Sequence, residues 1–273
     1  SREELTALLS RIDFFLEHTP EVLEARLVHE APGLRELVTR EPLGVVACVS
    51  AWNYPYFVGG NVYLPALLTG NVVLYKPSEF ATLSGLRVAE LWREAGLPEG
   101  VFQAAVGGGD VGRLLLDQSI DGAFFTGSFV TGRRIAAQLA PRLVPLQLEL
   151  GGKDPAYVTE DAPVERSAQA LVEGAFYNAG QSCCAVERIY VRRELFDDFV
   201  EHFVAETRKL RLGDPLDEAT TLGPLARRDA QIEVLEAQIR DATQQGARIL
   251  TGGRRAERPG FFFEPTVLVD VDH

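Results

Sequence analysis

Two adjacent cysteines near the middle of the chain are the residues best suited to covalent chemistry. Cys183 and Cys184 lie in residues 176–185, where a segment with apolar residues at helical spacing gives way to Gly180, a residue type common at helix ends. A thiol on such a turn, close to backbone N–H groups, can lose its proton more easily and act as a nucleophile. From this stretch alone, a pair of buried structural cysteines is an equally good interpretation, because free cysteine is among the most buried residue types.

Two polar residues that follow apolar segments could assist such a nucleophile. Glu149 lies between two leucines, where a carboxylate is costly unless it has a task. Partial burial would raise its pKa and suit it to act as a general base, whereas an ion pair with Lys153 or an arginine is the alternative. The amide of Asn53 could donate a hydrogen bond to a developing oxyanion, although an asparagine close to Pro55 is more often a turn residue.

Three other short stretches have residue types that bind nucleotides. Residues 107–112 match G-x-G-x-x-G, although a tight glycine turn explains them equally well and no acidic residue ends the next apolar segment, 123–126. Ser128 is placed to cap a helix, and a helix start can also bind a pyrophosphate. Lys76 and Glu79 could hold the two hydroxyls of a ribose, with a surface turn as the alternative.

The first half of the chain has the pattern of a parallel sheet covered by helices on both faces. An amphipathic helix over 2–18 and a hairpin formed by 22–29 and 35–39 come first. Apolar strands then alternate with helical stretches, and ligands in such α/β sheets bind beyond the carboxyl ends of the strands. We expect strands at 45–49, 72–75, 101–105, 123–125 and 144–148, and helices at 57–69, 82–95, 110–117 and 129–139.

The second half contains another alternating block. We expect strands at 156–158 and 189–191, helices at 164–178, 195–208 and 228–244, and extended segments at 249–250, 261–263 and 266–269. The fold class is therefore α/β. We place an NAD-binding domain at 1–150, which includes an oligomerisation hairpin at 21–41, and an incomplete catalytic domain at 151–273.

Composition excludes several classes of function. With 27 basic and 39 acidic residues, the net charge of −12 disfavours nucleic acid and anionic membranes as partners. The apolar runs, such as 45–49, are too short to span a bilayer. Three cysteines do not make a disulfide framework, so we expect a reducing, cytoplasmic setting. No cluster has metal-ligand spacing, so we expect no metal site.

Taken together, the motifs identify a family. The chain resembles the aldehyde dehydrogenase superfamily from about residue 2 to residue 272, and the order and spacing of its motifs are specific. These motifs are Trp52-Asn53, Lys76-Pro-Ser-Glu79, Phe125-Thr-Gly-Ser128, Leu148-Glu-Leu-Gly-Gly-Lys153 and Gly180-Gln-Ser-Cys183. The resemblance implies an α/β fold with a parallel-sheet cofactor domain, a catalytic domain and a hairpin flap. It also implies oxidation of a small-molecule aldehyde to an acid with NAD or NADP.

The resemblance also implies a role for each motif residue. Cys183 corresponds to the nucleophile, with Cys184 a bystander whose side chain should diverge from it. Glu149 corresponds to the base that activates the hydrolytic water, and Asn53 and the backbone N–H of Cys183 to the oxyanion hole. Residues 107–112 become a supporting turn. The implied cofactor-binding residues are Trp52, Lys76, Ser78, Glu79, Gly127, Ser128, Leu150 and Gly151.

Cofactor choice, assembly and substrate are less well defined. Glu79 favours NAD, because a carboxylate near the ribose 2′-hydroxyl would repel the 2′-phosphate of NADP. The hairpin resembles the family's subunit-bridging flap, which implies a homodimer or homotetramer. Four aromatic residues could line a substrate tunnel, although aromatics at helical spacing are more often core residues. They are Tyr54, Phe57, Phe176 and Tyr177.

The chain also departs from the family pattern. It ends before the Glu-x-Phe-Gly-Pro motif that holds the nicotinamide ribose, and its start also looks shortened, so we predict poor stability or activity for the isolated 273-residue chain. A non-catalytic remnant that acts as an interaction module, and a cofactor-independent thiol esterase, are the alternative functions. Residues 184–188 differ from the usual pattern after the nucleophile, so the substrate subclass stays open. The acyl acceptor, water or another thiol, stays open too.

Overall fold

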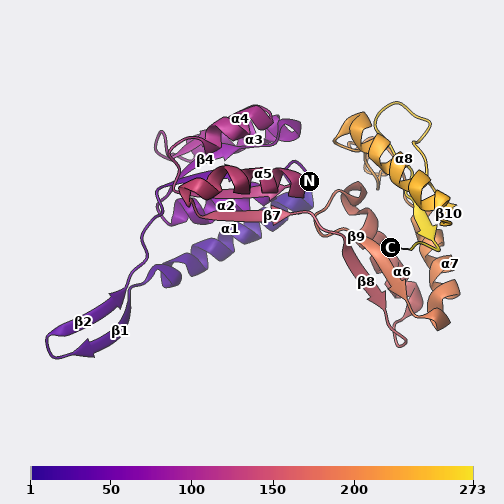
Figure 1. Ribbon diagram of the computed structural model, residues 1–273, viewed down its shortest axis with the longest axis horizontal. Helices are drawn as coiled ribbons and strands as arrows, with labels where there is room; N and C mark the ends of the chain where they lie inside the picture. Colours follow the sequence, from indigo (N-terminus) through magenta and orange to yellow (C-terminus); the bar gives the residue numbers. More distant parts are fainter. Residues whose placement is uncertain (1, 273) are drawn as a thin grey trace. The chain divides into compact units, whose positions relative to one another are not determined.

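The computed structural model describes residues 2–272, and the chain forms two compact units, residues 1–150 and 151–273 (Figure 1). The boundary between the units coincides with the domain boundary expected from the sequence. The cofactor-binding and catalytic roles of the two units stay predictions. No helix within residues 2–272 is long and apolar enough to cross a membrane.

A five-stranded parallel sheet forms the centre of the first unit. Its strands are β3 (Val45–Val49), β4 (Val72–Lys76), β5 (Phe102–Ala104), β6 (Gly122–Gly127) and β7 (Leu146–Leu150), arranged in the order β5-β4-β3-β6-β7. The chain builds outward from β3 to β5 and then returns to add β6 on the other side of β3. The carboxyl ends of β3 and β6 therefore flank the switch point where such sheets bind ligands. The predicted parallel sheet is confirmed.

Helices cover both faces of this sheet (Figure 1). They are α1 (Arg2–Leu23), α2 (Phe57–Leu68), α3 (Thr82–Glu94), α4 (Gly109–Leu116) and α5 (Phe129–Leu139). Helices α4 and α5 pack on one face through Leu115 and Leu139, and α1, α2 and α3 cover the other face around Tyr63 and Val88. Successive residues of β3 alternate between the two cores, as the pleat of a strand requires.

The hairpin that precedes the sheet projects from the first unit (Figure 1). It pairs β1 (Arg26–Ala31) with β2 (Leu34–Val38) in antiparallel fashion, and every residue of β2 is exposed. The first strand begins later than predicted, because α1 continues through Pro20 to Leu23 rather than ending at residue 18. A proline removes one intrahelical hydrogen bond but retains a helical φ, so a last helical turn can include it.

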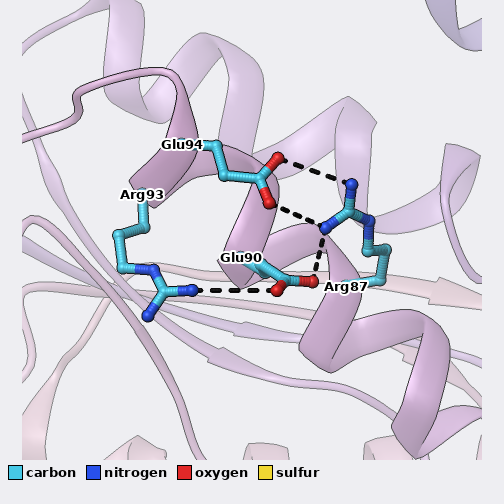
Figure 2. Close-up of polar contacts among 4 residues, drawn as sticks. All are labelled: Arg87, Glu90, Arg93 and Glu94. Atoms are coloured by element: carbon cyan, nitrogen blue, oxygen red, sulfur yellow. Dashed lines mark hydrogen bonds and ion pairs between the residues drawn. The ribbon is translucent and has the colours of Figure 1, made fainter.

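Exposed arginine and glutamate side chains form ion pairs along the surface of α3 (Figure 2). Arg87 contacts Glu90 and also Glu94, at 3.0 Å, while Arg93 lies 3.7 Å from Glu90. Arg87 holds the pKa of the Glu90 carboxyl below its usual value, and Glu90 raises the pKa of the Arg87 guanidinium. Because water screens exposed pairs, this network contributes little to stability and belongs to the helix surface.

The second unit begins with a parallel strand pair joined by a helix. Strand β8 (Asp154–Val158) pairs with β9 (Val186–Val191), and α6 (Val164–Phe176) connects them. Helix α7 (Phe196–Thr207) packs against α6 around Phe199 and Phe203. The two cysteines lie in the connection from α6 to β9, at the end of the pair where β8 begins.

Helix α8 (Arg228–Gln244) builds a second, smaller core in this unit, whereas Leu250 and Val267 extend the core of α6 and α7. Helix α8 packs through Ile232 on Leu225 and Phe263. Strands β10 (Arg248–Thr251) and β11 (Val267–Val269) form an antiparallel pair. Residues 2–272 also contain four short 3-10 turns, η1 (Glu79–Ala81), η2 (Ala140–Arg142), η3 (Tyr177–Gly180) and η4 (Arg193–Leu195).

Candidate active site

The loop that follows β3 carries two of the predicted site residues. Trp52 and Asn53 are both half-buried. The indole ring of Trp52 meets the ring of Phe80 edge-on, with centroids 6.5 Å apart. Phe80 belongs to η1, the turn that follows β4, so this contact joins the loops of two neighbouring strands at the carboxyl edge of the sheet.

Lys76, at the end of β4, is the buried cation of the first unit's candidate site. It is only 4% exposed, and its Nζ donates a hydrogen bond to the Pro77 carbonyl at 3.1 Å. Its Nζ also lies 4.0 Å from Oε2 of Glu79, whose side chain is half exposed. Burial lowers the pKa of Lys76, although Glu79 and Asp110 oppose that shift. The ammonium and the carboxylate are thus side by side, as a pair that binds ribose hydroxyls must be.

The glycine stretch at 107–112 supports this lysine. A Cβ on Gly112 would lie 3.3 Å from Cδ of Lys76, so the glycine allows α4 to pack on the aliphatic part of the lysine. Gly107 has a φ of +155°, and a Cβ there would clash with Val111 at 2.2 Å. Both observations agree with the interpretation of this stretch as a supporting turn.

The loop between β6 and α5 forms the next part of the same edge. The Oγ of Ser128 accepts a hydrogen bond from the N–H of Thr131 at 3.3 Å, which confirms the predicted helix cap. Gly127 is the last residue of β6. Leu150 ends β7 and lies against the first turn of α5, since a Cβ on Gly132 would be 2.7 Å from its Cδ2. The candidate residues of the first unit thus gather at one edge of its sheet.

Glu149 differs from its predicted environment. It lies within β7 rather than in the loop after the strand, and it is exposed and accepts a hydrogen bond from Gln147 at 3.1 Å. The prediction of partial burial is wrong, because side chains alternate along β7 and the leucines on either side take the inward positions. The predicted alternative of a pair with Lys153 is wrong as well, because Lys153 pairs with Glu187.

The cysteines of the second unit follow a left-handed turn. Helix α6 ends at Phe176, two residues earlier than predicted, because Asn178 and Ala179 have φ values of +51° and +56°. Gly180 continues the turn with a φ of +70°. Left-handed backbone at two residues other than glycine is costly, so the surrounding structure must hold this turn in place.

Both cysteine side chains are exposed in this structure. The pKa of Cys183 is raised, mainly by partial burial and secondarily by the neighbouring Cys184, whereas backbone hydrogen bonds oppose the shift. The prediction that this turn makes the proton easier to lose is therefore wrong, because desolvation outweighs the backbone N–H groups. The two thiols also interact rather than diverge. Cys48, by contrast, is a core residue of β3, as predicted.

The thiols should differ in their reactivity towards iodoacetamide. We expect Cys183 and Cys184 to be alkylated in the native protein and Cys48 to resist, because burial raises the pKa of Cys48 to about 12. Since the thiolate is the reactive form, alkylation of Cys183 should be slow at neutral pH and should accelerate through a midpoint above about 8.5, the usual value for cysteine. Peptide mass mapping after labelling at several pH values identifies the alkylated cysteines and measures the pH dependence of the Cys183 rate. Rapid labelling of Cys48 before unfolding would contradict the structure.

Gln181 holds the cysteine turn, a role that the sequence alone did not reveal. Its Oε1 accepts a hydrogen bond from the N–H of Ala226 at 2.9 Å, and its Nε2 donates to the Asn178 carbonyl at 3.0 Å. Ala179 packs against the core of α8 beside Leu225. The turn before Cys183 is therefore tied to a segment more than 40 residues later in the chain.

Replacing Gln181 with alanine should release this connection. A net hydrogen bond is worth about 1 kcal/mol, so the Ala226 amide should exchange with deuterium about fivefold faster. Gln181→Glu, which keeps an acceptor oxygen, should preserve most of the protection. Hydrogen exchange measured by NMR tests this, and equal rates in wild type and Gln181→Ala would show that the hydrogen bond does not hold the segment.

The aromatic tunnel stays a prediction, and two of its four residues make other contacts within their own units. Phe176 stacks towards Phe203 within the core of the second unit, and Phe57 lies under the guanidinium of Arg11. Tyr177, in contrast, lines an open hollow beside Cys184. Within the described residues, 2–272, no group of histidine, cysteine or carboxylate side chains could hold a metal ion.

Comparison with known proteins accounts for the arrangement of these motifs. The model of the Aldehyde dehydrogenase family matches residues 1–273. The chain belongs to this family. The resemblance noted from the sequence motifs is thus confirmed, as is the α/β fold.

Aldehyde dehydrogenases are also the relatives found by sequence and by structure. A betaine aldehyde dehydrogenase from Brucella anthropi is 42% identical over 237 residues, which cover 85% of this chain and 48% of the relative. An NADP dependent enzyme of E. coli superposes with a TM-score of 0.94 at 35% identity, covering 99% of this chain and 56% of the other. An NAD-dependent aldehyde dehydrogenase from Sinorhizobium meliloti superposes with a TM-score of 0.94 at 33% identity. The match covers 99% of this chain and 54% of that enzyme. This chain thus spans about half the length of these aldehyde dehydrogenases.

Proposed function

We propose that the natural protein containing this chain oxidises a small-molecule aldehyde to a carboxylic acid with a nicotinamide cofactor, and that Cys183 is its nucleophile. The observation that carries the proposal is the exposed thiol of Cys183 on a held turn, within a chain that matches the aldehyde dehydrogenase family throughout. An exposed, positioned thiol is what a covalent mechanism needs, whereas a structural cysteine would be buried, as Cys48 is.

Chain connectivity supports a shared role for Glu149 and Cys183. A Cβ on Gly152 would lie 3.9 Å from the carbonyl oxygen of Cys183, so this glycine lies against the backbone of the cysteine turn. Only two residues separate Gly152 from Glu149. Glu149 is therefore close in the chain to a residue that contacts the cysteine turn.

The chemistry then follows from the residue types. The Cys183 thiolate attacks the carbonyl carbon to form a thiohemiacetal, and the Asn53 amide and the Cys183 N–H stabilise the oxyanion. A nicotinamide cofactor, when bound at the first unit's candidate site, would supply the hydride acceptor for this oxidation. The carbon is thereby oxidised to a thioester on Cys183. Glu149 takes a proton from water, which attacks the thioester, releases the acid and restores the thiol.

The raised pKa of Cys183 adds a requirement to this mechanism. A thiol that holds its proton at neutral pH needs a base when the aldehyde arrives. Glu149 suits this task because it is exposed and accepts a hydrogen bond from the neutral amide of Gln147. Glu149 speeds loss of the thiol proton and passes that proton to solvent, which can also accept it directly. The later water proton is the one for which Glu149 is required.

The carboxyl edge of the first unit's sheet fits a dinucleotide. Lys76 and Glu79 form the adjacent cation and carboxylate that would bind the adenosine ribose, and the start of α5 at Ser128 suits a pyrophosphate. Trp52, Ser78, Gly127, Leu150 and Gly151 would complete the contacts. The exposed hairpin would bridge subunits in a homodimer or homotetramer, and a cytoplasmic location stays a prediction.

The cofactor should be NAD rather than NADP, and Glu79 should decide this. Replacing Glu79 with glutamine removes the charge that repels a 2′-phosphate, so the ratio of kcat/KM for NAD to that for NADP should fall about tenfold. Steady-state kinetics with both cofactors measures the ratio, and Glu94→Gln, an exposed change in the same unit, is the control. An unchanged ratio in Glu79→Gln would remove this residue from the cofactor site.

One comparison tests the proposed function as a whole. The natural protein is assayed for NADH formation with an aldehyde, betaine aldehyde among others, and for ester hydrolysis without cofactor. We expect aldehyde oxidation that depends on cofactor. Ester hydrolysis without aldehyde oxidation would identify a thiol esterase. The absence of both activities would indicate a non-catalytic interaction module. Either result would refute the proposal.

A further inference from the structure

An open hollow lies beside the cysteine turn, wholly within the second unit. Its volume is about 340 Å³, and most of its surface is apolar. Its lining residues are Ala170, Glu173, Gly174, Tyr177, Ser182 and Cys184. The hollow is large enough for the side chain of a small aldehyde, and it adjoins the residues that flank the proposed nucleophile.

One face of α6 and the turn after it form the wall of this hollow. Residues 170, 173, 174 and 177 recur at the spacing that places side chains on the same face of a helix. The opposite face carries Ala168 and Val172, which are buried in the core. Ala170 and Gly174 have little or no side chain, so space opens between the two larger residues, Glu173 and Tyr177.

The two residues that flank Cys183 in the chain, Ser182 and Cys184, both line the hollow. Cys184 lines the hollow, and its Sγ lies 3.3 Å from the Oγ of Ser182. Cys184 also raises the pKa of Cys183, so the two thiols are near neighbours. A substrate whose carbonyl carbon is bonded to Cys183 can therefore extend its substituent into the hollow.

The charged and aromatic side chains that line the hollow indicate which charge the substituent of the substrate should carry. Glu173 supplies a carboxylate, Tyr177 supplies an aromatic ring that is 42% exposed, and the lining contains no basic side chain. A carboxylate and an aromatic face both attract cations, and an ammonium group with an apolar surface suits both. An anionic substituent would meet only repulsion.

We propose that this hollow is a specificity subsite in which Glu173 selects aldehydes that carry a positively charged ammonium group close to the carbonyl. The inference rests on the proposed function, because it takes Cys183 as the point of attachment. It goes further by naming the substrate class and the residue that chooses it. Glu173 acts on binding rather than on the bond-making steps.

Charged thiol reagents test the subsite without any turnover. In a Cys184→Ser background, position 183 is modified by a trimethylammonium-ethyl or a sulfonato-ethyl methanethiosulfonate. In each case the thiolate attacks the reagent sulfur, a disulfide forms and methanesulfinate leaves. The ratio of the two rates, normalised to that of a free thiol, should favour the cation and should fall about fivefold in Glu173→Gln. Glu173→Lys should reverse the preference, and high salt should weaken it.

Glu165→Gln is the matched control, because it makes the same charge change on the exposed first turn of α6, outside the hollow. An equal fall in Glu165→Gln would mean that the ratio reports the general negative field of the protein, and would overturn the subsite. No fall in Glu173→Gln would overturn it as well.

Steady-state kinetics supplies the second test. Betaine aldehyde is compared with its neutral tert-butyl analogue, in which carbon replaces the nitrogen. We expect Glu173→Gln to raise KM for the cationic aldehyde about fivefold, with kcat and the neutral analogue little changed. Equal effects on both aldehydes would refute the inference. If neither aldehyde is oxidised, the proposed function fails, while the thiol reagents still decide whether the hollow selects cations.

Discussion

Replacing Cys183 with alanine should abolish cofactor-linked aldehyde oxidation in the natural protein, with a fall on the order of 10⁴-fold or more. The thiol forms the covalent bond to the substrate in the proposed mechanism, and no other exposed group can substitute for it at that position. Cys184 interacts with Cys183, but it lines the hollow beside the turn. Steady-state formation of NADH is the measurement.

Cys184→Ala is the matched control for this experiment, because it removes a neighbouring exposed thiol of the same size. We expect this variant to keep activity within about tenfold of wild type, since only packing beside the turn changes. If Cys183→Ala kept full activity, the nucleophile would be wrongly assigned. If Cys184→Ala were the inactive variant, the roles of the two cysteines would have to be exchanged.

Replacing Glu149 with glutamine should slow turnover by about 10²- to 10⁴-fold, which is the usual contribution of a general base. The loss should fall mainly on release of the acid, because water must then attack the thioester without a base. If the thioester still forms, the first turnover should release NADH in a rapid burst. Later turnovers should be slow, because each must wait for hydrolysis of the thioester. Added hydroxylamine, which needs no base to attack a thioester, should restore steady turnover.

The burst and its rescue separate a catalytic role from a structural one. Glu99→Gln is the control, because Glu99 is an exposed carboxylate in the turn before β5 and away from the carboxyl edge of the sheet. It should leave turnover unchanged. If Glu149→Gln showed neither a burst nor rescue, but lost the first NADH as well, Glu149 would be needed chiefly to deprotonate the Cys183 thiol. If Glu149→Gln turned over normally, its assignment as a base would be wrong.

Much of the first unit could be predicted from sequence because its strands are buried on both faces. The apolar runs at Val45–Val49 and Val72–Lys76 stand out from the helices around them, and a run of this kind is typical of a parallel strand. Ser128 could be predicted to cap α5 because capping depends on neighbouring residues only. The register of the sheet then brings the loops after the strands to one edge.

The environment of Glu149 was misjudged although the necessary signal was present. Leucine alternates with polar residues over Leu146–Leu150, and this period places the leucines inward and Glu149 outward. Flanking leucines indicate burial only where the strand is covered on both faces. In β7 only the leucines contact the core, while Gln147 and Glu149 between them are exposed.

The geometry of the cysteine turn could not be predicted from local sequence. Asn178 tolerates a left-handed backbone, but Ala179 does so only because the surrounding structure holds it. That structure includes the hydrogen bond that the Ala226 N–H donates to Gln181, and the core around α8 far along the chain. The raised pKa of Cys183 has the same origin, since desolvation depends on what surrounds the thiol in three dimensions.

The central claim is that Cys183 carries the acyl group and Glu149 enables its release. Mass spectrometry of the Glu149→Gln protein, mixed with an aldehyde and NAD and then digested, tests this most directly. The account predicts that the peptide containing Cys183 gains the mass of the oxidised acyl group, that hydroxylamine removes this mass, and that Cys183→Ala never gains it. An acyl group on Cys48, on Cys184 alone, or on no cysteine during active turnover would contradict the account.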